Sequence, residues 1–272
     1  MMEVSRPLPR LAFGQGLSVP GDRRLPAEVA VALSFNGTTQ AVMMATPANL
    51  EDFALGFALT EGIATRAEID SITVVETVGG IDVQVWLHSE AEARLAARRR
   101  TMAGPVGCGL CGIDSLAEAM RDVPPVPASG LQLTPAQVLA AVAALPSGQP
   151  LHDDTRAAHA AGFWTPDRGM VAICEDIGRH NALDKLAGLL ARIGQDCSVG
   201  AVVLTSRLSI DLVQKCAVMG APIMIAVSAP TTAAVGLSDT CGMTLIALAR
   251  AERFEVFTHE ARIQMKEAAH VA

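Results

Sequence analysis

The second half of the chain alternates short, continuously apolar segments with segments that have helical spacing. Strands are predicted at residues 170–173, 201–204, 222–227 and 244–248. Helices are predicted between them at residues 181–193, 210–219 and 232–240. Strands that are apolar throughout indicate a sheet with both faces buried under helices. This pattern restricts the larger part of the chain to the α/β class, with a three-layer α-β-α arrangement.

The first hundred residues predict a smaller α+β lobe with the order ββαββα. Alternating apolar residues flank 36–37, an Asn-Gly pair that favours the two positive φ values of a tight hairpin. A second hairpin is expected around the glycines at 79–80. Between the hairpins lies a helix with Asn49 as its N-cap and Gly62 at its end. A charged helix over 90–100 completes the lobe.

Proline-rich stretches divide the chain into four predicted parts. They are an N-terminal arm at 1–27, the α+β lobe at 28–122, a proline-rich linker at 123–130 and the α/β lobe at 131–272. The arm shows no periodicity, and the prolines of the linker prevent regular backbone hydrogen bonding. Thr134 followed by Pro135 predicts the start of the first helix of the α/β lobe.

Composition excludes several classes of function. The net charge of -7 and the pI near 5.4 argue against a nucleic-acid binder, and an aromatic content of 3% argues against base stacking. The chain has neither a signal-peptide pattern nor an apolar run near 18 residues, so we expect a cytoplasmic protein that does not enter the membrane. Six cysteines in that reducing compartment are not expected to form disulfides.

A Cys-x-x-Cys pair stands in a glycine-rich loop, Gly107-Cys108-Gly109-Leu110-Cys111-Gly112, before a short helix predicted over 114–121. A structural zinc site would need a second ligand pair, and the other four cysteines stand alone. A thioredoxin-type pair would follow an early strand and open a long helix. His88 and Glu90 offer the other residue types of a zinc deaminase, although Pro105 does not adjoin the first cysteine as that signature requires.

A nucleophilic or sulfur-carrying thiol is the remaining interpretation of this pair. Thiolates form near neutral pH beside cations or helix N-termini, and the run of arginines at 98–100 precedes the loop while a predicted helix follows it. Glycines at 107, 109 and 112 would leave both sulfur atoms accessible. The sequence alone leaves these alternatives open, along with two inert thiols in a turn.

Polar side chains follow three successive strands of the α/β lobe. Arg179 and His180 open a helix after the first of these strands, Ser206 and Arg207 follow the second, and Ser228 follows the third. Residues Asp176 and Asn181 are explained in part as helix caps. Strand-to-helix junctions at the carboxyl edge of a sheet bind anions, since helix N-terminal amides point outward there. We therefore expect a phosphate-bearing ligand at this edge, where His159 is a further candidate.

Several motifs together resemble one known family. They are the Cys-x-x-Cys loop, the block Glu175-Asp176-Ile177-Gly178-Arg179-His180-Asn181-Ala182-Leu183-Asp184-Lys185, the block Val227-Ser228-Ala229-Pro230-Thr231, and the segments Ala54-Leu55-Gly56-Phe57 and Leu59-Thr60-Glu61-Gly62. Over roughly residues 25 to 258 the chain is similar to the formate dehydrogenase accessory sulfurtransferases, the FdhD family.

The resemblance implies a sulfur relay. Cys108 would receive sulfur as a persulfide from a cysteine desulfurase, and Cys111 would assist its transfer to a molybdenum cofactor with two molybdopterin guanine dinucleotides, destined for formate dehydrogenase. It further implies a cytidine-deaminase-like fold, a homodimer, and cofactor contacts from one C-terminal segment. That segment is Leu248-Ala249-Arg250-Ala251-Glu252-Arg253. Rival hypotheses are a zinc-dependent deaminase and a cofactor-binding chaperone with incidental thiols.

This chain departs from the family pattern in its expected ligand site. The C-terminal segment usually carries Gly-Gly between its arginines, where this chain has Ala251 and Glu252. The usual T-G-G before the histidine is Thr-Arg-Ala at 155–157, and Cys174 replaces a common arginine. These changes bear on cofactor binding more than on the thiols.

Overall fold

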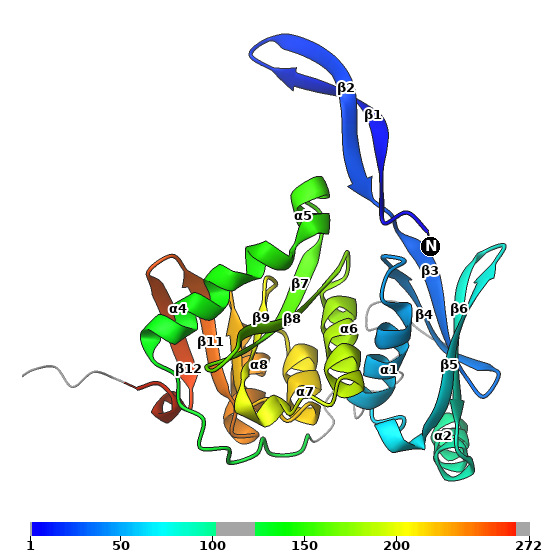
Figure 1. Ribbon diagram of the computed structural model, residues 1–272, viewed down its shortest axis with the longest axis vertical. Coiled ribbons are helices and arrows are strands. Elements are labelled where there is room, and N and C mark those ends of the chain that lie inside the picture. The colour runs from blue at the N-terminus through cyan, green and yellow to red at the C-terminus, as the bar shows by residue number, and fades with distance from the viewer. Residues whose placement is uncertain (1, 102–122, 265–272) are drawn as a thin grey trace, which may run out of the picture. The chain divides into compact units, whose positions relative to one another are not determined.

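The structure is a computed structural model that describes residues 2–101 and 123–264. These residues form three sheets of two, four and six strands together with their helices (Figure 1). The chain divides into two compact units that interleave along the sequence. Unit 1 comprises residues 1–121, 149–160 and 174–192, and unit 2 comprises residues 122–148, 161–173 and 193–272.

The N-terminal segment of unit 1 is a long β-hairpin, so the expectation of an arm without regular structure was wrong. Strand β1 (Ser5–Gly14) pairs with β2 (Leu17–Pro26) through a turn in which Gln15 and Gly16 have positive φ angles. The prolines that obscured this pattern are tolerated because each strand of a two-stranded ribbon has one open edge. At its base, Ser5 Oγ and Arg24 Nε donate to Asp154 Oδ2 over 2.7 and 2.6 Å.

The predicted ββαββα order is confirmed for residues 29–101, which follow the β1–β2 hairpin. Strands β3 (Val29–Phe35), β4 (Thr38–Ala45), β5 (Ile69–Thr77) and β6 (Gly80–Leu87) form a sheet in the order β4-β3-β6-β5. Helix α1 (Leu50–Thr60) and the 3-10 helix η1 (Arg66–Glu68) lie between the hairpins in sequence, and α2 (Ser89–Thr101) follows them.

Two turn predictions in unit 1 had different outcomes. Asn36 and Gly37 both have positive φ angles, as the hairpin signal requires. Asn49 occupies the N-cap position of α1, but its side chain does not cap the helix. Its φ of 54° places it in the left-handed region, whereas an N-cap side chain needs an extended backbone to reach the first amides.

Helix α6 (Arg179–Arg192) packs along α1 at unusually close range within unit 1. A Cβ atom added at Gly56 would overlap the backbone carbonyl of Asp184, and one added at Gly188 would overlap the carbonyl of Asp52. Two glycines therefore allow the two backbones to touch. Arg192 joins the helix ends by donating from Nε and Nη2 to the Asp52 carboxylate over 2.7 and 3.0 Å.

The six-stranded sheet has the order β12-β11-β10-β9-β7-β8. Its strands are β7 (His159–Thr165), β8 (Gly169–Asp176), β9 (Ala201–Leu204), β10 (Ile223–Ala226), β11 (Thr244–Arg250) and β12 (Arg253–Thr258). The four strands predicted from apolar runs are confirmed as β8 to β11. Strands β7 and β12 were not predicted, and each pairs antiparallel with its inner neighbour, β9 and β11 respectively.

The remaining helices follow the predicted alternation. They are α4 (Pro135–Ala144), η2 (Leu145–Gly148), α5 (Pro150–Thr155), η3 (Cys197–Val199), α7 (Ile210–Val218), α8 (Thr232–Thr240) and η4 (Glu260–Arg262). Thr134 caps α4 as expected, and its Oγ1 accepts from the backbone amide of Gln137 over 3.2 Å.

Helices cover both faces of the sheet in unit 2. Every residue of β9 and β10 is buried, which requires cover on each face. Val138 and Ala141 of α4 share a core cluster with alternate strand residues, among them Val203 and Ile225. Helices α7 and α8 connect the parallel strands β9, β10 and β11, and such right-handed crossovers place both helices on the opposite face (Figure 1).

Candidate functional site

Cys108 and Cys111 lie outside the described residues, as does the helix predicted over 114–121. The other four cysteines are described, and each is a buried free thiol. Burial raises the pKa of Cys174 and of Cys197 to about 12, and it also raises the pKa values of Cys216 and Cys241. Because the thiolate is the nucleophile, these four are inert near neutral pH. None of these four is a candidate for thiolate chemistry near neutral pH.

The junction between β8 and α6 is organised by a buried carboxylate. Asp176 Oδ1 accepts from the Gly178 amide over 2.8 Å and from Asn181 Nδ2 over 2.9 Å. Its Oδ2 accepts from the Thr46 amide over 3.0 Å and lies 2.7 Å from Lys185 Nζ. Neither side chain of the Asp176–Lys185 pair is exposed to solvent, and the ammonium also donates to the Thr46 carbonyl over 2.9 Å.

This network separates structural from ligand-directed residues in the polar block at 175–185. Asp176 and Lys185 neutralise each other, and Asn181 is used in bonds to Asp176 and to the Met44 carbonyl. The predicted capping role is not seen for Asp176 or Asn181, because Asp176 accepts from the Gly178 amide before α6 begins and Asn181 lies inside the helix. Glu175 accepts from the backbone amides of α5 at 151–152, each over 2.8 Å. Arg179 and His180 are partly exposed and are not members of the Asp176 network.

A cluster of basic side chains surrounds His159, which is half-buried at the start of β7. Burial lowers the pKa of His159, and the positive charges of Arg179, His152 and His180 lower it further, whereas Asp176 opposes them. Arg179 Nε is buried and has no hydrogen-bond partner among the residues that the structure describes. The cluster is therefore suited to an anion. His152 was missed because its helix, α5, carries no motif in the sequence.

A second basic set lies at the carboxyl edge of the parallel strands in unit 2. Arg207 is exposed just after β9, and Ser228 is partly exposed just after β10. Ser206 is buried, and its hydroxyl donates to the Arg207 carbonyl over 3.0 Å, so it supports this loop from within. The Ser228 carbonyl accepts from the Leu248 amide over 3.1 Å, which ties β11 to the same edge.

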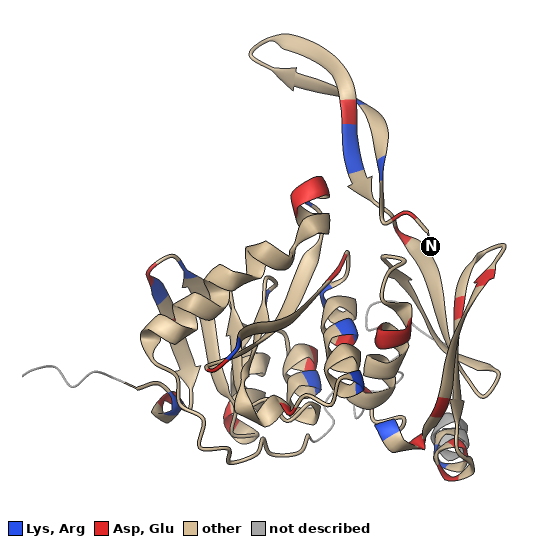
Figure 2. Ribbon diagram, in the orientation of Figure 1, with Lys and Arg blue, Asp and Glu red and all other residues tan. Residues whose placement is uncertain are grey.

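The C-terminal segment 248–253 forms the end of β11, a two-residue turn and the start of β12. Ala249 is fully buried in the core, whereas Arg250, Glu252 and Arg253 are exposed, and Figure 2 shows both charge signs at this turn. Arg250 Nε donates to the Val227 carbonyl over 3.0 Å and pairs across the turn with Arg253. Ala251 has a φ of 50°, a conformation that glycine adopts without strain.

The structure thus groups the predicted ligand residues into two sets. His159, Arg179 and His180 belong to unit 1, while Arg207, Ser228 and the 248–253 turn belong to unit 2. Adjacent strands are about 4.8 Å apart, so the β9, β10 and β11 ends in unit 2 span roughly 10 Å. That width suits the phosphates of a nucleotide-like ligand.

The two residues proposed for a zinc deaminase are both exposed. His88 and Glu90 flank Ser89, the first residue of α2, and their expected co-ligands Cys108 and Cys111 lie outside the described part of the chain. Within residues 2–101 and 123–264, no group of three His, Cys, Asp or Glu side chains is placed to hold a metal ion. Over the same residues, no helix has the length and apolar character needed to cross a membrane.

Together these features define a mixed α/β protein with three sheets and basic groups gathered at strand ends. A solved structure from Desulfotalea psychrophila, described as a formate dehydrogenase accessory protein, has the same fold. The TM-score is 0.74 at 26% sequence identity, and the match covers 96% of this chain and 100% of the other.

Sequence comparison agrees with the structural match. The sulfur carrier protein FdhD of Agrobacterium fabrum is 51% identical over 259 residues, which cover 95% of this chain and 96% of that protein. The sulfur carrier protein FdhD of Brucella abortus is 48% identical over 262 residues, with coverage of 96% and 97%. The FdhD/NarQ family model matches residues 26–264. The chain therefore belongs to the FdhD/NarQ family, which confirms the resemblance seen in its motifs.

Proposed function

We propose that this protein is a sulfurtransferase that carries sulfur on Cys108 to a molybdenum cofactor required by formate dehydrogenase. The observation that carries the proposal is the near full-length likeness to proteins named sulfur carrier proteins. The inertness of the four buried thiols supports it, because it leaves the Cys-x-x-Cys pair as the reactive sulfur atoms.

Loading of sulfur requires one thiol exchange. The Cys108 thiolate attacks the outer, sulfane sulfur of a persulfide on a cysteine desulfurase. The sulfur–sulfur bond of the donor breaks, the donor cysteine leaves as a thiolate, and Cys108 becomes the persulfide. No net oxidation occurs, because the transferred sulfur keeps its oxidation state.

Delivery of sulfur uses the second thiol. The Cys111 thiolate attacks the Sγ atom of Cys108, the persulfide bond breaks, and hydrosulfide leaves toward the acceptor. A disulfide between Cys108 and Cys111 remains, and a cellular dithiol must reduce it by two electrons before the next cycle. This role explains the two-residue spacing, since a resolving thiol must be close enough in the chain to form a disulfide with its partner.

The acceptor that we propose is the molybdenum cofactor with two molybdopterin guanine dinucleotides. Its pyrophosphates match the basic edge formed by Arg207, Arg250 and Arg253, while the Ser228 hydroxyl offers a neutral hydrogen-bonding group. Glu252 places a carboxylate on the same turn, which weakens the attraction for phosphate. The basic cluster of His159, Arg179 and His180 belongs to unit 1, and we propose it as a separate group of anion-binding residues.

The partners follow from this chemistry. A cysteine desulfurase supplies the sulfur and formate dehydrogenase receives the completed cofactor, while nucleic acid and membrane have no part. We propose a cytoplasmic homodimer whose larger lobe is cytidine-deaminase-like in fold without zinc chemistry. We also propose the proline-rich segment 123–130 as the boundary between the two lobes, although residues 149–160 and 174–192 belong to unit 1.

Activation of formate dehydrogenase by the purified protein tests the proposal. Cys108→Ala should abolish activation, and Cys197→Ala, a change at a buried inert thiol, should leave it intact. Full activation by Cys108→Ala would refute the sulfur relay and favour the rival hypothesis of a cofactor-binding chaperone. Arg253→Gln should weaken binding of guanosine diphosphate, used as a probe of the cofactor's nucleotide part, without affecting sulfur loading.

A further inference from the structure

A cavity in unit 2 lies apart from the proposed cofactor edge. It has a volume of about 340 Å³ and is lined by residues 128–132 together with His259, Ala261 and Arg262. His259, Ala261 and Arg262 follow β12, which runs antiparallel to β11, so the cavity is at the amino edge of the parallel strands. The seven residues of β11 separate this edge from Arg250 by about 20 Å.

The walls of the cavity are fixed by backbone bonds. Leu133 and Ile263 form a parallel bridge, and the Leu133 amide donates to the Arg262 carbonyl over 2.8 Å. Gln132 Nε2 donates to the Ala261 carbonyl over 3.3 Å. Residues 132–133, which follow the proline-rich segment, are thereby held against η4 and Ile263.

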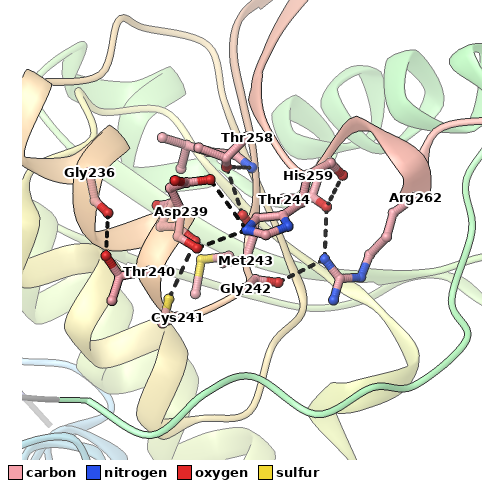
Figure 3. Close-up of polar contacts among 12 residues, drawn as sticks. Gly236, Asp239, Thr240, Cys241, Gly242, Met243, Thr244, Thr258, His259 and Arg262 are labelled. Atoms are coloured by element: carbon pink, nitrogen blue, oxygen red, sulfur yellow. Dashed lines mark hydrogen bonds and ion pairs between the residues drawn. The ribbon is translucent and has the colours of Figure 1, made fainter.

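Arg262 is the cationic group of this cavity. Its Nη1 donates to the Gly242 carbonyl over 2.8 Å and to Thr244 Oγ1 over 3.1 Å (Figure 3). Thr244 Oγ1 in turn donates to the His259 carbonyl over 2.8 Å. Both hydrogens on Nη1 are therefore used, and they hold the guanidinium in one orientation.

The rest of the guanidinium is uncompensated. Among residues 2–101 and 123–264, no carboxylate pairs with Arg262, and its Nη2 and Nε donate no hydrogen bond. Burial lowers the pKa of Arg262, and the nearby Cys241 opposes this shift. Asp239, the nearby acid in Figure 3, instead lies 3.6 Å from His259 Nε2.

We propose that this cavity binds a small carboxylic acid with a short apolar chain, and that Arg262 holds the carboxylate through Nη2 and Nε. Two parallel N–H groups match the two oxygens of a carboxylate. Ala128, Leu131 and Ala261 line the remaining space together with Ser129, Gly130, Gln132 and His259, and most of the lining surface is apolar, so the ligand's tail should be apolar. One cation and a mostly apolar lining favour a single negative charge over a dianionic phosphate, and the volume is near the lower limit of ligand cavities, roughly 300 Å³.

Titration calorimetry with sodium butyrate tests this site in the full-length protein. Butyrate should bind, butyramide and phosphate should bind much more weakly, and Arg262→Gln should reduce butyrate affinity roughly tenfold or more. Arg168→Gln, at an exposed arginine of the same unit that bonds to Gln195, is the matched control and should change nothing. Ala261→Phe, which fills the cavity while leaving the Arg262 bonds in place, should also abolish binding.

Four results would overturn the proposal. The first is the absence of butyrate binding, and the second is binding that survives both Arg262→Gln and Ala261→Phe in variants that melt like the parent protein. The third is phosphate binding as tight as that of butyrate, which would indicate a general anion site. The fourth is tighter binding of N-acetyl-alanyl-leucine than of butyrate, which would mean that the site binds the carboxyl terminus of a peptide and not a small acid.

Discussion

Loss of the Asp176 charge should destabilise the protein far more than loss of a surface carboxylate. Asp176 accepts three hydrogen bonds and pairs with Lys185 at 2.7 Å, and both side chains are fully buried. The change Asp176→Asn leaves a buried ammonium without a counter-charge and turns an amide group toward at least one backbone donor. Removing one partner of such a pair costs about 3 to 5 kcal/mol. The total free energy of unfolding of a natural domain is only about 5 to 15 kcal/mol.

Urea denaturation followed by circular dichroism measures this change. Asp153→Asn is the control, because Asp153 forms an exposed ion pair with Arg156, and its loss should cost less than about 1 kcal/mol. The double variant Asp176→Asn, Lys185→Met should be more stable than the sum of the two single changes predicts, since it removes both buried charges. A cost below about 1 kcal/mol for Asp176→Asn, or simple additivity, would refute the structural role assigned to the pair.

Three further predictions follow from close packing, from electrostatics and from burial. Gly188→Ala should lower the free energy of unfolding by about 1 to 3 kcal/mol, because the backbone of α1 occupies the space of the added Cβ. Gly236→Ala, in open space on α8, should raise the free energy of unfolding by about 1 kcal/mol. Thermal denaturation compares the two variants, and equal effects would contradict the close contact between α1 and α6. Arg179→Gln should raise the pKa of His159 in an NMR titration, with Arg94→Gln as the control, and an unchanged pKa would disprove the basic cluster. The His159 pKa of the parent protein should lie below 6.5. The unfolded chain therefore takes up the proton first, and the folded state loses stability as the pH falls through 6.5. Alkylation of the native protein at pH 8 should spare the four buried thiols until urea is added, and rapid native labelling of any would count against their inertness. These thiols are Cys174, Cys197, Cys216 and Cys241.

The periodic parts of the fold were predictable because burial on both faces leaves continuous apolar runs. The sequence therefore located β9 and β10 within two residues at each end. The hairpin β1–β2 was not predicted because its side chains are largely exposed, so its sequence shows no alternation of apolar and polar residues. Its prolines, which are tolerated at open strand edges, also argued against strands. Strand β12 was not predicted because it lies at the edge of the sheet and its residues alternate only weakly in burial.

The candidate site was predictable in residue type but not in role. Arg179, Asn181 and Lys185 are all polar and lie within seven residues of one another, and nothing local reveals that only Arg179 is outside the buried network. That assignment depends on Thr46, which is 130 residues away from Asp176 in the chain. Long-range hydrogen bonds therefore decided which polar residues are available to a ligand.

Arg262 shows the same limit on sequence analysis. Nothing in its surroundings marks a binding residue, because the cavity combines a segment near 130 with one near 260. The bridge between Leu133 and Ile263 brings these segments together.

The central claim is that Cys108 carries sulfur, and mass spectrometry tests it most directly. The protein is incubated with a cysteine desulfurase and cysteine, and its peptides are then separated without reductant. The account predicts an added mass of about 32 Da on the peptide that contains Cys108, a persulfide adduct. Cys108→Ala should show no adduct on that peptide, whereas Cys216→Ala should retain it. Sulfur loading that persists at the same level in Cys108→Ala, or no loading of the parent protein, would contradict the account.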